Sequence, residues 1–239
     1  MNATRLLWLR IAVFILCLLP FIRLFVLGYN DELGANPVEF VTRSTGIWTL
    51  VFVCLTLAVT PLRRLTGFTW LIRLRRMLGL YAFFYSAIHL ATYVWFDQWF
   101  DWSAIVVDVI KRPFITAGFV GFLIMVPLML TSNNFSMRRL GRRWGRLHKA
   151  VYIVGLAGII HFWWHKAGKN DFFEPTIYAV IVLILLGLRY YWFRADKKKA
   201  ALRAAGHRAD KSGLSGKSGC SGQPELSGSA SKPALTGHQ

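Results

Sequence analysis

The sequence predicts an all-α integral membrane protein, a bundle of six transmembrane helices with both termini in the cytoplasm. Hydrophobic residues make up 55% of the 239 residues. Six apolar stretches are long enough to cross a bilayer, and the connections between them alternate in charge. Because soluble domains carry shorter and less frequent apolar runs, this composition excludes a water-soluble globular protein.

Each apolar stretch can span the ~30 Å of bilayer hydrocarbon at a helical rise of ~1.5 Å per residue. The stretches cover residues 6–27, 44–62, 77–96, 114–131, 147–164 and 175–193. The first lacks a small-residue cleavage site, so we expect a retained helix and not a signal peptide. A further stretch, Trp102 to Ile110, is too short to cross and contains Asp108, so we expect an interfacial segment.

Arginine is concentrated in the second and fourth connections, and this sets the expected orientation. These arginines are Arg63, Arg64, Arg73, Arg75, Arg76, Arg138, Arg139, Arg142, Arg143 and Arg146. The other connections mix acidic and basic residues. Since cytoplasmic loops are enriched in Lys and Arg, we expect these two connections and both termini in the cytoplasm.

We divide the chain into a transmembrane domain, residues 1–194, and a basic tail, residues 195–239. The tail is rich in Ser and Gly and is predicted to be disordered beyond about residue 205. Its charge favours contact with anionic lipid, and the net charge of +18 reflects membrane topology and not nucleic-acid binding. The three cysteines form no motif for a disulfide framework, zinc or covalently attached haem.

Histidine points to a cofactor, because ionisable side chains inside a bilayer are costly and usually functional. His89 lies twelve residues into the third stretch. His148 lies at the start of the fifth stretch, and His161 follows it by thirteen residues. At helical rise, both lie roughly 18–20 Å from the cytoplasmic side. Two histidines at equal depth on different helices can bind one haem iron on both axial faces.

Small residues before these histidines leave room for a flat macrocycle. They are Ala82, Ser86, Ala157 and Gly158. The alternative is a histidine pair that hydrogen-bonds between helices without a cofactor. His165 follows His161 by one turn at the end of its stretch, where we expect an interfacial role or an additional ligand.

Motifs for other chemistry are absent from the sequence. It has no phosphate-binding loop, dinucleotide fingerprint, nucleophile motif or paired intramembrane carboxylate. A small transporter is weakly supported, with Pro20 and Pro127 as candidates for a broken helix. That function and a cofactor-free assembly scaffold stay open as alternatives, which an optical spectrum separates from a haem protein.

Five segments resemble the MsrQ family, formerly YedZ, and the likeness covers roughly residues 5–195. They read LTLAVTPLRR (55–64), RRMLGLYAFFYSAIHLATY (75–93), KRPFITAGFVGF (111–122), LMLTSNNFSMRRLGRRWGRLHKAVY (128–152) and IIHFWWHKAG (159–168). The chain resembles, more distantly, the membrane domain of ferric reductases and NADPH oxidases. Their fifth helix carries two haem histidines at the spacing of His148 and His161.

The MsrQ resemblance implies a haem b electron-transfer subunit of the bacterial inner membrane. It implies a heterodimer with MsrP, a periplasmic molybdopterin enzyme that reduces methionine sulfoxide, so the subunit itself is not the sulfoxide reductase. Electrons would come from the quinone pool or a cytosolic flavin reductase. The resemblance also implies FMN, and it implies that the haem residues are His89, His148 and His161. The alternative function is that of another ferric-reductase-like haem b electron carrier.

One position departs from the wider superfamily. Where oxidase-type third helices carry a second histidine, about fourteen residues before the outer one, this sequence has Arg75. His148 therefore lacks the second histidine with which it would bind a haem in the wider superfamily. At this position on the cytoplasmic side we expect either a second haem held differently or a flavin. Arg75 and Arg76 are candidates for the FMN phosphate, since guanidinium groups bind phosphate bidentately. Arginine is also what the positive-inside rule provides there.

Overall fold

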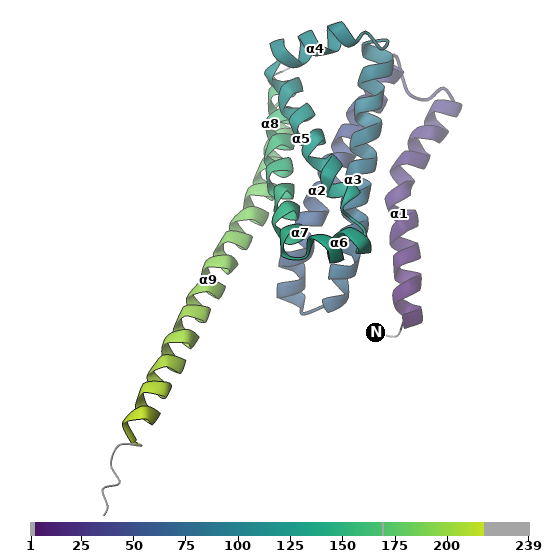
Figure 1. Cartoon of the computed structure of the whole chain (residues 1–239). Coiled ribbons are helices and arrows are strands. Elements are labelled where there is room, and N and C mark those ends of the chain that lie inside the picture. The colour runs from purple at the N-terminus through teal and green to yellow at the C-terminus, as the bar shows by residue number, and fades with distance from the viewer. Residues whose placement is uncertain (1–2, 169, 218–239) are drawn as a thin grey trace, which may run out of the picture. The chain divides into compact units, whose positions relative to one another are not determined.

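The computed structural model describes residues 3–168 and 170–217, and helices make up nearly all of these ranges (Figure 1). No strand occurs within them, which confirms the predicted all-α class. The chain divides into a unit that ends at Tyr191 and a second unit that begins at Trp192. The candidate site lies entirely in the first unit.

Six helices of the described residues are long and apolar enough to cross a membrane, as the sequence predicts. The six spans are Thr4–Tyr29, Pro37–Thr66, Thr69–Asp97, Pro113–Leu130, Arg142–Ala167 and Phe173–Gly206. Their main helices are α1 (Ala3–Tyr29), α2 (Pro37–Thr66), α3 (Ile72–Thr92), α5 (Pro113–Leu130), α8 (Val151–Ala167) and α9 (Phe173–Lys217). A short turn, η1 (Thr69–Leu71), precedes α3, and a π-helical turn, η2 (Tyr93–Asp97), follows it.

Local sequence sets where α2 begins and ends. The Asn36 side chain accepts a hydrogen bond from the Glu39 amide, and Pro37 occupies the first turn, where its missing N–H costs nothing. At the other end, Gly67 has a φ of 74°, a left-handed conformation that glycine adopts readily. Its amide donates to the Arg63 carbonyl and closes the helix.

Short helices lie at the two ends of the first unit, which we call the α4 end and the α6 end. α4 (Trp102–Lys111) lies across one end, and α6 (Asn134–Leu140) and α7 (Arg142–Leu147) lie at the other (Figure 1). α4 corresponds to the expected interfacial segment. Hydrogen bonds from the Ser103 hydroxyl and the Ala104 amide to the Asp101 carboxylate begin this helix and lower the pKa of Asp101.

An aromatic layer forms the core between α1, α2 and α3. Phe52 of α2 stacks on Tyr81 and Tyr85 of α3 at centroid distances of 5.6 and 5.2 Å. Tyr85 is fully buried. α2 packs mainly against α3, and α5 mainly against α8, so the bundle consists of two closely packed helix pairs with α1 against the first pair.

The Tyr85 hydroxyl is inserted into the hydrogen-bond ladder of α1. It accepts from the Phe21 amide at 3.1 Å and donates to the Cys17 carbonyl at 2.9 Å, two groups that bond each other in a regular helix. Pro20 weakens the ladder at this turn, where a side chain can enter. α1 remains helical through Pro20, so this candidate for a broken span is continuous.

Replacing Tyr85 with Phe is expected to lower the free energy of unfolding by about 1–3 kcal/mol, because two buried backbone groups lose their partner. Thermal unfolding of the detergent-purified protein measures the change. Tyr81→Phe is the matched control, since the Tyr81 hydroxyl donates to one backbone carbonyl, that of Phe14, and a smaller loss is expected. Equal losses in the two variants would contradict the inserted role.

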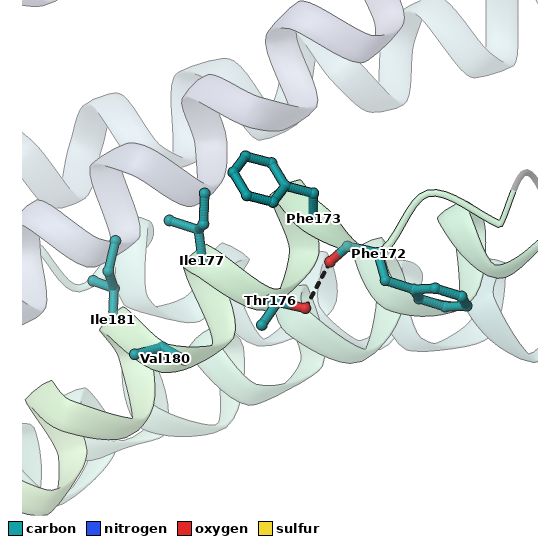
Figure 2. A pocket seen from close by; sticks show the side chains of 6 residues that line it. All are labelled: Phe172, Phe173, Thr176, Ile177, Val180 and Ile181. Carbon is teal, nitrogen blue, oxygen red and sulfur yellow. Dashed lines mark hydrogen bonds between the residues drawn. The ribbon is translucent and has the colours of Figure 1, made fainter.

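The first turns of α9 border a shallow apolar depression (Figure 2). Its lining residues are Phe172, Phe173, Thr176, Ile177, Val180 and Ile181. The Thr176 hydroxyl donates to the Phe172 carbonyl at 2.6 Å, so this polar group is already paired. Such a surface matches what a spanning helix presents to lipid.

α9 continues past its apolar stretch as far as Lys217. The sequence predicts disorder beyond about residue 205, and the structure instead has helix over residues 206–217. Residues 197–205 consist mainly of Ala, Lys, Leu and Arg, which have high helix propensity and favour continuation of the helix. The rest of the expected disordered segment, residues 218–239, lies outside the described residues.

Candidate functional site

His89 of α3 and His161 of α8 lie side by side toward the α4 end of the first unit. Their ring centroids are 5.9 Å apart, and the ring planes are at 80° to each other. Both side chains are partly buried. The two histidines that the sequence predicts at equal depth are therefore in contact across two helices.

Each of these histidines has a backbone partner for its Nδ1 atom. His89 Nδ1 lies 2.8 Å from the Thr42 carbonyl of α2, and His161 Nδ1 lies 2.7 Å from the Phe114 carbonyl of α5. Because a carbonyl oxygen accepts and never donates, Nδ1 carries the proton in both rings. The lone pair of each Nε2 is then available, as in histidines that bind a metal.

The spacing of the two rings fits a haem iron. Metal–imidazole bonds of about 2 Å on both axial faces hold two rings with centroids roughly 6 Å apart. The macrocycle supplies the other ligands, so two histidines complete the coordination. Interhelical hydrogen bonding, the alternative without a cofactor, accounts for Nδ1 and leaves Nε2 unexplained.

A glycine on a neighbouring helix lets each ring reach its position. A Cβ on Gly46 of α2 would lie 3.1 Å from His89 Cε1, and a Cβ on Gly118 of α5 would lie 2.8 Å from His161 Nδ1. Sequence analysis missed both glycines and both carbonyls. Two of the small residues that it singled out have other neighbours: Gly158 lies beside Leu50 of α2, and Ala157 lies beside Gly121 of α5.

His165 lies one turn along α8 and is exposed. Its ring centroid is 6.4 Å from that of His161 and 5.8 Å from that of Phe114. Whether it serves as an additional ligand stays a prediction of the sequence.

His148 is separate from this pair and lies in η3 (His148–Ala150), at the α6 end. Its ring stacks on Trp144 with centroids 4.0 Å apart. Its Nδ1 lies 3.2 Å from the Trp144 carbonyl, and its Nε2 lies 3.5 Å from the Ser132 hydroxyl. Among the residues that the structure describes, His148 therefore contacts α7 and the segment just after α5, and not a second histidine.

The two arginines that the sequence predicts for the FMN phosphate, Arg75 and Arg76, have different neighbours. Arg75 lies within electrostatic range of His148, Arg189 and Tyr152, at the α6 end of the first unit. Arg76 is exposed and donates to the Asn134 side chain of α6 at 2.9 Å. Arg75, and not Arg76, is the arginine that the fold brings to His148.

Arg189 of α9 is a further residue that sequence analysis missed. Its guanidinium donates to the Tyr152 hydroxyl, to the Leu57 carbonyl at 2.8 Å and to the Thr60 hydroxyl at 3.0 Å. Pro61 has no N–H, so the Leu57 carbonyl has no donor within α2, and Arg189 supplies one. One feature of the sequence could have identified Arg189, namely that it is an arginine inside an apolar stretch.

Comparisons with known proteins identify the family. Residues 45–159 match a family described as ferric reductase like transmembrane component. The protein-methionine-sulfoxide reductase heme-binding subunit MsrQ of Ralstonia nicotianae is 58% identical over 81% of this chain and 89% of its own. The MsrQ of Polaromonas naphthalenivorans is 49% identical over 81% of this chain and 90% of its own.

The chain belongs to the MsrQ family. The resemblance expected from the sequence is thereby confirmed. The ferric-reductase-like match covers His89 and His148 and ends two residues before His161. In this MsrQ-family chain, the match covers most of α2, all of α3 and α5, and the first part of α8. These helices carry His89, His161 and their carbonyl partners, and of these residues Thr42 and His161 lie just outside the match.

An ion-pair cluster ties α2, α8 and α9 together at the α4 end of the MsrQ fold. Lys166, at the end of α8, is only 4% exposed and contacts Asp171 and Glu174. Arg43 of α2 also binds Glu174, at 3.0 Å. Lys166 lowers the pKa of the Asp171 carboxyl. Lys166 follows His161 by five residues on α8, so the cluster supports the placement of α2 and α9 beside this helix.

Proposed function

We propose that this chain is the haem b membrane subunit of a methionine sulfoxide reductase system and carries electrons across the bacterial inner membrane. Its acceptor is MsrP, the periplasmic molybdopterin enzyme that reduces methionine sulfoxide in oxidised proteins. This chain is not itself the sulfoxide reductase. The pair His89 and His161 carries the proposal, because two Nε2 lone pairs are available between α3 and α8. The MsrQ relatives are named heme-binding subunits, which supports this cofactor.

The residues of the chain have separate roles in this function. A bound haem b supplies one-electron redox chemistry. His89 and His161 would hold the iron through Nε2, while the Thr42 and Phe114 carbonyls orient the rings and would make the ligating nitrogens more basic. The apolar side chains of the spans exclude water from this position.

We further propose a second cofactor site at the α6 end. His148 and Arg75 would bind the cofactor, and Arg76 is a further candidate. FMN is the proposed occupant, reduced by the quinone pool or by a cytosolic flavin reductase. The interaction of Arg75 with His148 supports this pairing. The arginines of the second and fourth connections support a cytoplasmic α6 end and cytoplasmic termini.

The partner is expected to dock at the α4 end, on residues 97–102 and 166–174. Charge on these segments is mixed, so we expect a transient contact of modest area that weakens with salt. Asp101→Lys is expected to weaken MsrP binding several-fold at low salt, measured by surface plasmon resonance on the nanodisc-embedded protein. Arg146→Glu, at the opposite end, is the control. Binding that responds neither to salt nor to Asp101→Lys would contradict this docking site.

The test of the proposed function is an absorption spectrum of the purified protein, with pyridine-haem and flavin quantification. Low-spin b-type haem and stoichiometric flavin are expected. A spectrum without haem would favour the transporter or scaffold instead. The match to a ferric reductase like family favours one other candidate, a haem b carrier with a different acceptor. Reoxidation faster with ferric chelate than with MsrP would support that candidate.

A further inference from the structure

Arg189 carries a positive charge inside the sixth apolar stretch, toward the α6 end. Its hydrogen-bond partners, the Tyr152 hydroxyl, the Leu57 carbonyl and the Thr60 hydroxyl, are all neutral. Its guanidinium also lies 5.1 Å from the Tyr152 ring centroid. A charge at this position is costly, and such residues usually have a charged partner or a function.

The contacts of Arg189 leave part of its guanidinium open. Hydrogen bonding to the Leu57 carbonyl explains why a donor is useful beside Pro61, and an uncharged donor would meet that need equally well. The Arg189 Nε atom is buried and has no hydrogen-bond partner in the described residues. A buried N–H without an acceptor is rare and indicates a missing partner.

Arg75 contributes a second positive charge within electrostatic range of Arg189. It interacts electrostatically with both Arg189 and Tyr152. Within residues 3–168 and 170–217, neither arginine forms an ion pair with a carboxylate. Two like charges in a medium of low dielectric constant repel each other strongly, and an anion between them would turn this repulsion into attraction.

We propose that Arg75 and Arg189 together bind the phosphate group of a ligand at the α6 end. The inference rests on the second cofactor site of the proposed function, where this phosphate would be that of FMN. A phosphate monoester carries nearly two negative charges and three acceptor oxygens, which match two guanidinium forks. The Tyr152 hydroxyl accepts a hydrogen bond from Arg189 and so orients its guanidinium.

A phospholipid headgroup has the same chemistry and is the other source of a phosphate. A lipid would place its acyl chains on the outer face of the bundle, whereas a flavin would place its ring toward His148. The experiment therefore measures the two ligands separately.

The test compares FMN with riboflavin, which has the same ring but no phosphate. Flavin-depleted protein in detergent is titrated with each, and the quenching of flavin fluorescence gives the two dissociation constants. The native protein should prefer FMN by at least about tenfold, as charge-assisted hydrogen bonds to a phosphate provide. In Arg189→Gln and in Arg75→Gln the preference should fall to less than about threefold, with riboflavin affinity unchanged.

Phosphorus analysis of the delipidated protein tests the lipid source. Loss of one equivalent of lipid phosphorus in Arg189→Gln, with no flavin preference in the native protein, would keep the phosphate site and remove FMN from the proposed function. An unchanged FMN preference and unchanged phosphorus in both arginine variants would overturn the proposal. Arg146→Gln removes an exposed charge from α7 and should change neither quantity.

Folding is checked through the distant histidine pair. The low-spin spectrum of haem at His89 and His161 should persist in every arginine variant. Arg189→Lys keeps the charge and a donor for the Leu57 carbonyl, so it serves if Arg189→Gln does not fold. It should retain an intermediate FMN preference, because lysine has no planar fork.

Discussion

Replacing His161 with Ala is expected to remove most of the bound haem, and His89→Ala is expected to do the same. In the proposed function each imidazole would supply one ligand to the haem iron, so the loss of either ring would weaken haem binding between α3 and α8. Any haem that remains should be high spin. Pyridine-haem content per protein, together with the absorption and electron paramagnetic resonance spectra, measures both effects.

His165→Ala is the matched control for this experiment. His165 lies on the same face of α8, one turn further, and is exposed. Its removal should leave the low-spin spectrum nearly unchanged. Retention of a normal low-spin spectrum by both His89→Ala and His161→Ala would exclude this pair as the axial ligands.

The second large effect is expected from Gly118→Ala, a change of one methyl group at a residue that binds no cofactor. The new Cβ would lie 2.8 Å from His161 Nδ1 and 3.0 Å from its Cε1, which is too close for either side to stay in place. The ring must rotate or α5 must move away, and the bond from Nδ1 to the Phe114 carbonyl is lost. Since such an outer partner contributes about 10-fold to 100-fold in metal affinity, haem affinity should fall by roughly that factor.

Haem retention during dilution in detergent measures the effect of Gly118→Ala. Gly46→Ala should weaken haem binding less, because its Cβ would lie 3.1 Å from His89 and a small shift relieves the contact. Gly187→Ala is the control, since nothing lies within 4 Å of the added methyl group. Equal haem affinity in the Gly118 and Gly187 variants would show that His161 does not depend on the close approach of α5.

The two ends of the bundle differ in the chemical groups that they offer to a ligand. At the α4 end, His89 and His161 are neutral donors of electron pairs, held by backbone carbonyls and suited to a metal. At the α6 end, Arg75 and Arg189 are hydrogen-bond donors with positive charge and suit an anion. A single bundle therefore offers two chemically distinct positions, consistent with two successive cofactors of different kinds.

The sequence by itself determined the number of spans, their approximate ends and the common depth of His89 and His161. These properties depend on the length of apolar runs and on a fixed rise per residue, which are local and regular. The interfacial segment at Trp102 followed from the same reasoning, because its apolar run is too short to cross. The prediction that Arg75 serves a cofactor also followed from its place in a motif, and it stays a prediction.

Only the tertiary structure decided which groups from other helices meet these residues. The Thr42 and Phe114 carbonyls, and the glycines Gly46 and Gly118, reach the histidines through the rotation and crossing of α2 and α5. Those angles arise from side-chain packing along entire helix faces, which no local pattern encodes. For the same reason the contact of Arg189 with the carbonyl freed by Pro61, more than 120 residues earlier in the chain, emerges only when α9 packs beside α2.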